Sequence, residues 1–173
     1  ADFEMVYYNS DGRKSTMCGN GGRCIVMFAK DIGIIENRCS FLAVDGYHTA
    51  VINANNSVSL KMQNVESVKP YGNDFVTNTG SPHYVSFCNA VNDIDIVKEA
   101  HSIRYNDDFK SEGINVNFVE KTSHNSLYVR TYERGVEDET YSCGTGVVAS
   151  AICFANKNGT EINEVDIETP GGK

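Results

Sequence analysis

An internal repeat constrains the fold of this chain more than any other feature of its sequence. The segment Met17–Gly22, which reads Met-Cys-Gly-Asn-Gly-Gly, recurs 125 residues later as Ser142–Val147, which reads Ser-Cys-Gly-Thr-Gly-Val. Residues 43–46 match residues 168–171 at the same offset, and both segments end in glycine. Two matches at one offset indicate a duplicated unit, so we predict two similar halves.

An apolar stretch follows each copy of the repeat. Residues 22–30 and 147–155 carry apolar side chains on nearly every helical face, and Gly33 and Gly159 stand where helix C-termini commonly place a glycine. A helix that is apolar all round must be buried on all sides, and both stretches are too short to cross a membrane. Each half is therefore predicted to be a sheet wrapped around one buried central helix.

Strands are predicted where β-branched and aromatic residues are frequent. These segments are residues 3–8, 46–53, 57–62, 84–88, 115–119 and 126–133. Residues 93–101 predict an amphipathic helix with Asp93 as its N-cap. Proline, glycine and asparagine in residues 68–74 place a domain boundary there, between an N-terminal half (residues 1–67) and a C-terminal half (residues 68–173). The predicted fold class is α/β of the α+β type, with two pseudo-symmetric halves and mostly antiparallel or mixed sheets.

The composition argues against several classes of protein. With 23 acidic and 15 basic residues, the net charge of −8 argues against nucleic-acid binding. No run of about 18 apolar residues supports a membrane span, and the first residues lack the pattern of a secretory signal. Six cysteines in this length do not make a disulfide framework, which predicts a reducing, cytoplasmic setting. The cysteine spacing does not match a zinc site, so no metal is expected.

Both cysteines of the repeat directly precede a predicted helix. Free backbone N–H groups and the positive end of a helix dipole lower the pKa of a thiol at such a position, in known cases to about 3.5–7.5, and they also bind anions. A glycine-rich turn before a helix can instead be a plain connection, and a single copy would not decide between the two interpretations. Two equivalent thiols on two similar halves can serve opposite faces of one carbon, which is what the inversion of a stereocentre requires.

These motifs resemble those of a known family. Residues 17–24 (Met-Cys-Gly-Asn-Gly-Gly-Arg-Cys) resemble one signature of the diaminopimelate epimerase family, and residues 132–135 (Tyr-Glu-Arg-Gly) with 143–146 (Cys-Gly-Thr-Gly) resemble the other. Four further segments follow in the family's order: residues 8–12, 82–83, 115–118 and 169–172. The resemblance covers essentially the whole chain, and it implies the fold of that family.

The resemblance also implies an activity. The family's enzymes are isomerases that interconvert LL- and meso-2,6-diaminopimelate, for lysine and peptidoglycan precursor biosynthesis, without pyridoxal phosphate, another cofactor or a metal. The expected partner is this small molecule, with neither nucleic acid nor a membrane, and a homodimer is left open. The family's catalytic pair corresponds to Cys18 and Cys143, one acting as base and the other as acid.

The remaining positions of the family's site also have counterparts here. The implied substrate-binding residues are Asn9, Gly19, Asn20, Asn115, Glu133, Arg134, Gly144 and Thr145. His83 and Glu133 match positions that tune the pKa values of the two thiols. Ser81 departs from the family's usual asparagine before the Pro-His pair. Glu133 stands one residue farther from Cys143 than is common, which predicts a bulge in residues 136–139.

Two alternative interpretations stay open. The chain could be another two-thiol racemase or isomerase of the same fold, either proline racemase-like or PhzF-like. The family's N-terminal Gly-Asn-Asp-Phe segment and its last strand have no counterpart in residues 1–173, so the chain is expected to be truncated at both ends. It could then be an inactive fragment that only binds an amino acid.

Overall fold

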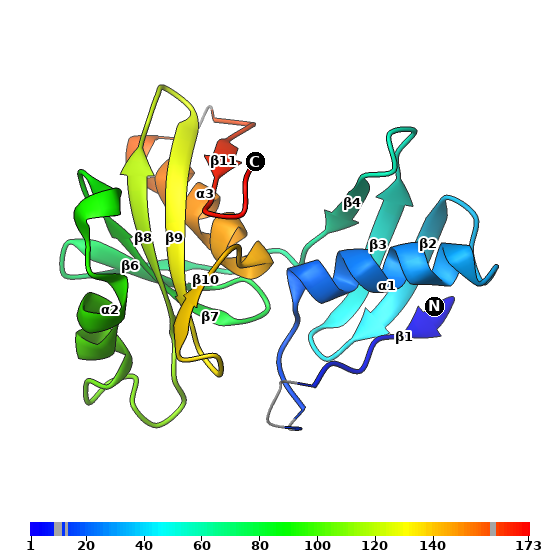
Figure 1. Ribbon diagram of the computed structural model, residues 1–173, viewed down its shortest axis with the longest axis horizontal. Coiled ribbons are helices and arrows are strands. Elements are labelled where there is room, and N and C mark those ends of the chain that lie inside the picture. The colour runs from blue at the N-terminus through cyan, green and yellow to red at the C-terminus, as the bar shows by residue number, and fades with distance from the viewer. Residues whose placement is uncertain (9–11, 13, 160–161) are drawn as a thin grey trace. The chain divides into compact units, whose positions relative to one another are not determined.

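The chain forms two compact units, Ala1–Asn64 and Val65–Lys173. The structure is a computed structural model that describes residues 1–8, 12, 14–159 and 162–173. Its elements are shown in Figure 1, and each unit contains its own sheet and its own helix after a Cys-Gly turn. The α+β fold class predicted from the sequence is confirmed.

The first unit is a four-stranded sheet with one helix across it (Figure 1). The strands lie in the order β1-β2-β3-β4, with β1 parallel to β2 and the other neighbours antiparallel. The bounds are β1 Phe3–Glu4, α1 Gly19–Asp31, β2 Arg38–Ala43, β3 Gly46–Ile52 and β4 Val58–Lys61. Alternate residues of β2 and β3 are buried, as expected for a sheet with one face against a core.

The predicted burial of the first helix on all sides is wrong. The buried residues of α1 form a single stripe, spaced three or four apart: Gly19, Gly22, Val26 and Ala29. Phe28 is 60% exposed, and Cys24 is exposed as well. The sheet covers one side of the helix only, so the apolar residues on the other side keep contact with solvent.

The second unit is a seven-stranded sheet with helices on both faces (Figure 1). Its strands lie in the order β10-β9-β8-β7-β6-β5, with β11 paired to β9, and β7 and β8 are parallel. The strand bounds are β5 Val68–Tyr71, β6 Asp74–Asn78, β7 Pro82–Phe87, β8 Asn115–Lys121, β9 Ser126–Glu133, β10 Asp138–Thr140 and β11 Asp166–Glu168. The helices are η1 Val91–Asp93, α2 Ile96–Arg104 and α3 Gly144–Asn158.

Residues of β8 are buried on both faces of this sheet. Val116 and Phe118 join the core cluster that includes Ile96 and Ala100 of α2. Val119 joins a separate cluster with Ala149 and other residues of α3. Because successive residues of a strand point to opposite faces, the odd-numbered residues of β8 face α3 and the even-numbered ones face α2.

Several predicted boundaries differ from the structure. The first strand is two residues long, and β2, β5, β6, β10 and β11 were not predicted. The helix predicted from Asp93 begins at Ile96, and its N-cap is Asp95, whose carboxylate accepts a hydrogen bond from the backbone N of Lys98 at 3.2 Å. Asp93 itself ends a short 3-10 turn. Two aspartates stand close together in the sequence, and only the folded backbone decides which of them caps the helix.

Residues 136–139, where the sequence predicts a bulge, lie in a tight turn and at the start of β10. The turn links the paired residues Glu133 and Asp138, so Glu139 already belongs to β10. Glu137 has a left-handed backbone with φ of 59°, which is uncommon for a residue other than glycine.

The core of the first unit gives a stability prediction. Phe41 is fully buried and stacks on Phe3, with ring centroids 5.1 Å apart. We expect Phe41→Ala to lower the free energy of unfolding by about 3–5 kcal/mol, and the exposed control Phe28→Ala to change it by about 0.5 kcal/mol or less. Urea unfolding followed by circular dichroism measures both. Equal losses in the two variants would contradict the one-sided packing of α1.

Candidate functional site

The first cysteine of the repeat caps helix α1. Cys18 has an extended backbone (φ −112°, ψ 111°), and its sulfur accepts a hydrogen bond from the backbone N of Gly21 at 3.4 Å. Its carbonyl accepts the first helical bond, from the backbone N of Gly22 at 2.8 Å. The thiol is partly buried. Cys18 is thus held at the positive end of a helix, where backbone amides favour negative charge.

The second cysteine caps helix α3 with nearly the same backbone. Cys143 has φ of −113° and ψ of 108°, and its carbonyl accepts a hydrogen bond from the backbone N of Val147 at 2.9 Å. Its thiol is buried, with 7% of the residue exposed, and its sulfur lies 3.5 Å from Oγ1 of Thr145. The two cysteines therefore occupy equivalent positions of the repeat in backbone conformation as well as in sequence.

The neighbours of the two thiols differ. Asn20 in the first repeat and Thr145 in the second stand at equivalent positions, two residues after the cysteine. The Oδ1 atom of Asn20 accepts a hydrogen bond from Arg23 of the same helix. The hydroxyl of Thr145 instead lies 2.8 Å from Nε2 of the buried His83, and its carbonyl accepts a hydrogen bond from the hydroxyl of Thr79 at 2.8 Å. The second thiol is thus linked to the sheet beneath it.

The imidazole of His83 is enclosed and uncharged. It is fully buried in β7, and its Nδ1 atom lies 3.1 Å from the amide nitrogen of Asn117. Burial lowers the pKa of His83 to about 3, and the positive charge of Arg134 acts in the same direction. At neutral pH the ring is therefore neutral, with one nitrogen that donates and one that accepts.

Glycine at the fourth position of Cys-Gly-Thr-Gly has a steric cause. A Cβ atom on Gly146 would overlap Oδ1 of Asn117, and it would lie 3.3 Å from Oγ1 of Thr131. The first turn of α3 therefore rests directly on the buried amide of β8. At the equivalent position Gly21, the nearest atom to an added Cβ is the flexible end of Met5, at 3.1 Å.

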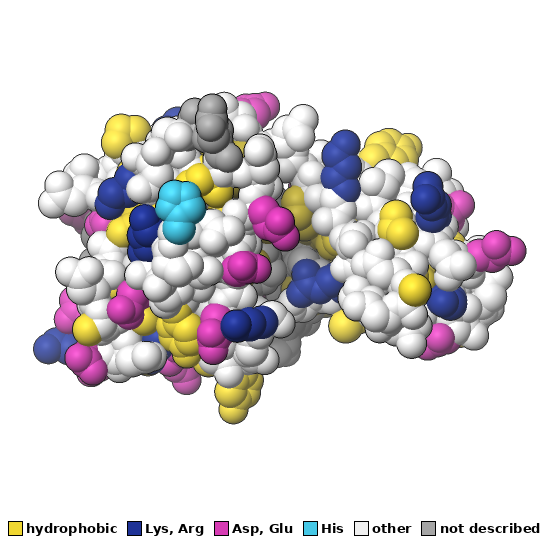
Figure 2. Space-filling model, turned by 90° about the horizontal axis from the view of Figure 1, so that it is seen from above, with side chains coloured by type: hydrophobic (Ala, Val, Ile, Leu, Met, Phe, Trp, Pro, Cys, Tyr) yellow, Lys and Arg dark blue, Asp and Glu magenta, His cyan; other side chains and the backbone are white. Residues whose placement is uncertain are grey.

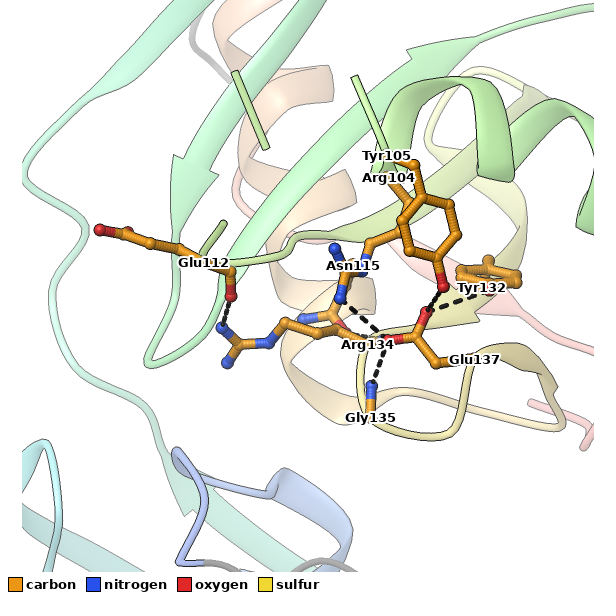
Figure 3. Close-up of polar contacts among 8 residues, drawn as sticks. All are labelled: Arg104, Tyr105, Glu112, Asn115, Tyr132, Arg134, Gly135 and Glu137. Atoms are coloured by element: carbon orange, nitrogen blue, oxygen red, sulfur yellow. Dashed lines mark hydrogen bonds and ion pairs between the residues drawn. The ribbon is translucent and has the colours of Figure 1, made fainter. Parts of the chain in front are cut away.

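Arg134 directly follows β9 and lies in a polar network (Figure 3). Its backbone N donates to Oδ1 of Asn115 at 2.9 Å, and its guanidinium donates to the carbonyl of Glu112 at 2.9 Å. The Asn115 amide in turn donates to the hydroxyl of Ser81 and to the carbonyl of Pro82. Asn115 thus uses both of its donors inside the protein, and Ser81 accepts one of them.

Glu137 holds the turn that carries Arg134 (Figure 3). Its carboxylate accepts hydrogen bonds from the guanidinium of Arg104 at 3.0 Å and from the hydroxyl groups of Tyr105 and Tyr132, each at 3.1 Å. The backbone N of Gly135 donates to it at 3.2 Å. Burial would raise the pKa of Glu137, but these donors outweigh burial and the pKa lies below its ordinary value. The carboxylate therefore stays charged and braces the turn.

Two arginines pass each other at Gly113. A Cβ on Gly113 would lie 2.6 Å from Cδ of Arg134 and 2.9 Å from Cζ of Arg104, and its φ of 76° also favours glycine. Burial lowers the pKa of Arg134, as does the charge of Arg104. Sequence reasoning missed Arg104, Gly113 and Glu137. A glycine before a buried strand was a signal that other atoms approach the backbone closely at Gly113. Nothing in the sequence marked the side chains of Arg104 and Glu137.

The remaining predicted residues have the following places. Gly19 and Gly144 are the first residues of α1 and α3 and are buried. Glu133 ends β9 partly buried, and burial raises the pKa of its carboxyl group. Within the second unit the structure brings Cys143, Thr145 and His83 together, and it joins Asn115 to Arg134. Asn9 lies outside the described residues.

The distribution of charged and metal-ligating side chains bears on other kinds of site. Acidic and basic side chains are interspersed over the face shown in Figure 2. Among the residues that the structure describes, no group of three or more His, Cys, Asp or Glu side chains could hold a metal ion. No helix in this described part is long and apolar enough to span a membrane.

The repeat provides a matched pair of glycine variants. We expect Gly146→Ala to destabilise the protein by about 1–3 kcal/mol, because the added methyl group must displace the Asn117 amide or the first turn of α3. Gly21→Ala places the same group against the flexible end of Met5, so its loss should be clearly smaller. Thermal unfolding of both variants measures the difference. A Gly146→Ala protein as stable as the wild type would contradict the close packing of α3 on β8.

The burial of His83 predicts a dependence of stability on pH. Its folded pKa of about 3 lies below the ordinary value of 6.5, so the unfolded chain binds more protons between these two values. The contribution of the neutral His83 ring to the free energy of unfolding is therefore complete above pH 6.5. It is lost as the pH falls towards 3, by at most about 1.4 kcal/mol per pH unit. Urea unfolding across this range should show a shallower dependence in His83→Gln than in the wild type. The exposed control His124→Gln should match the wild type, and parallel curves for all three proteins would contradict the prediction.

Comparison with known proteins supports the motif resemblance. The family model described as "Diaminopimelate epimerase" matches residues 75–173. The diaminopimelate epimerase of Flavobacterium psychrophilum is 52% identical over 172 residues, which cover 99% of this chain and 67% of that protein. The diaminopimelate epimerase of Chlorobaculum tepidum is 42% identical over 159 residues, covering 88% of this chain and 62% of that protein. The chain thus spans about two thirds of the length of these relatives.

A solved structure supports the fold independently of the sequence. A hydroxyproline epimerase from Agrobacterium vitis superimposes with a TM-score of 0.69 over 98% of this chain and 60% of that one, at 15% sequence identity. At this identity the likeness concerns the fold alone. The family model over residues 75–173 and the relatives of 42–52% identity show the family: the chain belongs to the diaminopimelate epimerase family of isomerases.

Proposed function

We propose that the protein interconverts LL- and meso-2,6-diaminopimelate, with Cys18 and Cys143 as the two acid–base groups. The observation that carries this proposal is the equivalent placement of the two thiols, each as the N-cap of the helix that follows its Cys-Gly turn. Membership of the diaminopimelate epimerase family supports the choice of substrate.

The proposed reaction is a two-base proton transfer. The thiolate of one cysteine removes the α-proton, and the thiol of the other delivers a proton to the opposite face of the same carbon. One turnover leaves the two sulfurs with exchanged protonation states, so the same pair serves the reverse direction. Groups placed for such transfers typically contribute about 10²–10⁴-fold in rate.

Backbone amides of the two helix ends suit the charge that develops in this reaction. Removal of the α-proton moves negative charge onto the adjacent carboxylate, which becomes enediolate-like. We assign its recognition to the first residues after the two cysteines: Gly19, Asn20, Gly144 and Thr145. Preorganised donors of this kind contribute roughly 2.7–4 kcal/mol each to the stability of a transition state.

The other end of the substrate carries a second carboxylate and a second ammonium group. The planar guanidinium of Arg134 suits the carboxylate through paired hydrogen bonds. Glu133 can accept hydrogen bonds from an ammonium group, and Asn9 and Asn115 complete the proposed binding set. Within this set Asn115 also positions the backbone of Arg134, since its Oδ1 atom accepts from that backbone N while both amide protons are donated within the protein.

We assign to His83 and Glu133 the role of biasing which of the two thiols is ionised. His83 acts on Cys143 through Thr145, which lies between the imidazole and the sulfur. We further propose that the reaction needs neither pyridoxal phosphate nor a metal, that it serves lysine and peptidoglycan precursor biosynthesis in the cytoplasm, and that the protein binds no nucleic acid.

A proline racemase-like or PhzF-like activity is the competing assignment. The solved hydroxyproline epimerase shares the fold at 15% identity, whereas the diaminopimelate epimerase relatives share 42–52%. The acidic and basic pair Glu133 and Arg134 also suits a substrate with a second charged end better than proline. Incubation in D₂O with each amino acid separates the two assignments, because only the true substrate exchanges its α-proton.

Single replacements of the thiols test the mechanism. We expect Cys18→Ala and Cys143→Ala each to lower the rate of epimerisation by at least about 10²-fold, because one face of the carbon loses its acid–base group. The exposed Cys24 provides the control, and Cys24→Ala should retain the wild-type rate. Optical rotation or deuterium incorporation measures turnover, with EDTA-treated protein as a further arm. Wild-type turnover in Cys143→Ala, or inhibition by EDTA that zinc reverses, would overturn the proposal.

A further inference from the structure

A chain of buried polar side chains leads from the sheet of the second unit to Cys143. It consists of Thr131, Asn117, His83 and Thr145, none of which is more than 3% exposed. His83, Asn117 and Thr131 are brought together by strand pairing, since Asn117 is opposite Val85 on β7 and opposite Thr131 on β9. Their alternation along the strands turns all three towards α3.

The direction of the hydrogen bonds at Asn117 follows from one carbonyl group. The carbonyl oxygen of Tyr84 can only accept, and it lies 2.8 Å from the Asn117 amide, so the nitrogen Nδ2 must face it. The oxygen Oδ1 then accepts from the hydroxyl of Thr131 at 3.0 Å. The second proton on Nδ2 is directed at Nδ1 of His83, 3.1 Å away.

The tautomer of His83 follows from this contact. Because Nδ1 accepts a hydrogen bond from Asn117, it carries no proton, and a neutral ring then has its proton on Nε2. The Nε2–H group donates to Oγ1 of Thr145 at 2.8 Å. The low pKa of His83, which comes from burial and from the charge of Arg134, is consistent with a neutral ring.

The hydroxyl proton of Thr145 is then directed away from His83. A hydroxyl group that accepts from Nε2–H keeps its own single proton for another acceptor, and the sulfur of Cys143 lies 3.5 Å away. We propose that Asn117 locks His83 in the Nε2–H tautomer and thereby makes Thr145 a hydrogen-bond donor to the sulfur of Cys143. Asn117 is then a positioning residue for the second thiol, a role that rests on the proposed function of Cys143.

The direction of this relay decides which state of the sulfur is favoured. A hydroxyl donor stabilises a thiolate, since hydrogen bonds to a charged acceptor are stronger than those to a neutral one. In the opposite tautomer, Thr145 would donate to His83 and present only lone pairs to the sulfur, which would favour the protonated thiol. Gly146 keeps the Asn117 amide close to the first turn of α3, because a side chain there would overlap Oδ1.

Nitrogen-15 NMR of the histidine side chains tests the tautomer without any assay of turnover. We expect Nδ1 of His83 to give a pyridine-like shift and Nε2 to give a pyrrole-like shift with an attached proton. His83→Gln assigns the signals among the four histidines of the chain. A proton on Nδ1 of the wild-type ring would overturn the proposal.

Two pairs of variants test the effect on the sulfur. Asn117→Asp offers a carboxylate that accepts from Nδ1–H, so it should move the proton away from Nε2 and slow the alkylation of Cys143 by iodoacetamide at neutral pH about tenfold or more. Thr145→Val removes the hydroxyl group at nearly constant size and should slow the alkylation of Cys143 similarly. Thr145→Ser keeps a hydroxyl group, so Cys143 should be alkylated at the wild-type rate. Peptide mass spectrometry reports Cys143 and Cys18 in the same sample, and Cys18 provides the internal control.

The outcomes separate this inference from the proposed function. Alkylation of Cys143 at the wild-type rate in Thr145→Val would overturn the relay, whatever the protein catalyses. In the epimerase assay, Asn117→Asp should lower kcat with little change in KM, because the residue does not touch the substrate. If the NMR and alkylation results are as expected but Cys143→Ala keeps full activity, the relay stands and the proposed function fails.

Discussion

The close contact between the first turn of α3 and the buried amide of Asn117 is the constraint on which the surroundings of Cys143 depend. A strand residue and a helix terminus can approach this closely only where the helix lacks a side chain, and Gly146 meets that requirement. The same contact places Thr145 over His83 and fixes the sulfur of Cys143 beside a hydroxyl group. The same few atoms therefore pack the helix on the sheet and form the hydrogen bonds of the buried amide. Leaving that amide unpaired at this depth would be costly.

The duplicated motif supplies two thiols with the same backbone and different surroundings. Both cysteines cap helices with φ near −112° and ψ near 110°. The sulfur of Cys18 accepts from a backbone amide of its own helix and is partly exposed, whereas that of Cys143 is buried against a hydroxyl group tied to the sheet. In the proposed two-base reaction one sulfur holds a proton while the other lacks it, and the different surroundings act on each sulfur separately.

Local patterns in the sequence predicted where the candidate site residues lie in the fold better than they predicted the residues that support them. The repeat, the helix-capping cysteines and the position of Arg134 after a strand were all visible in local patterns. The residues that brace Arg134 were not, because Arg104 and Glu137 are 33 positions apart in sequence and meet only through α2 and the turn after β9. The all-round burial predicted for α1 failed for a related reason, since composition shows that a face is apolar but not whether a sheet covers it.

The sequence by itself determined that a cysteine stands directly before each of two helices, because helix capping and the order of strand and helix are local properties of a few consecutive residues. Only the tertiary structure decided what surrounds each sulfur. His83 and Thr145 are 62 positions apart, and Asn117 is 34 positions from His83. Their hydrogen bonds exist because strand pairing and the alternation of side chains bring them to one face beneath α3, and that register is a property of the whole sheet.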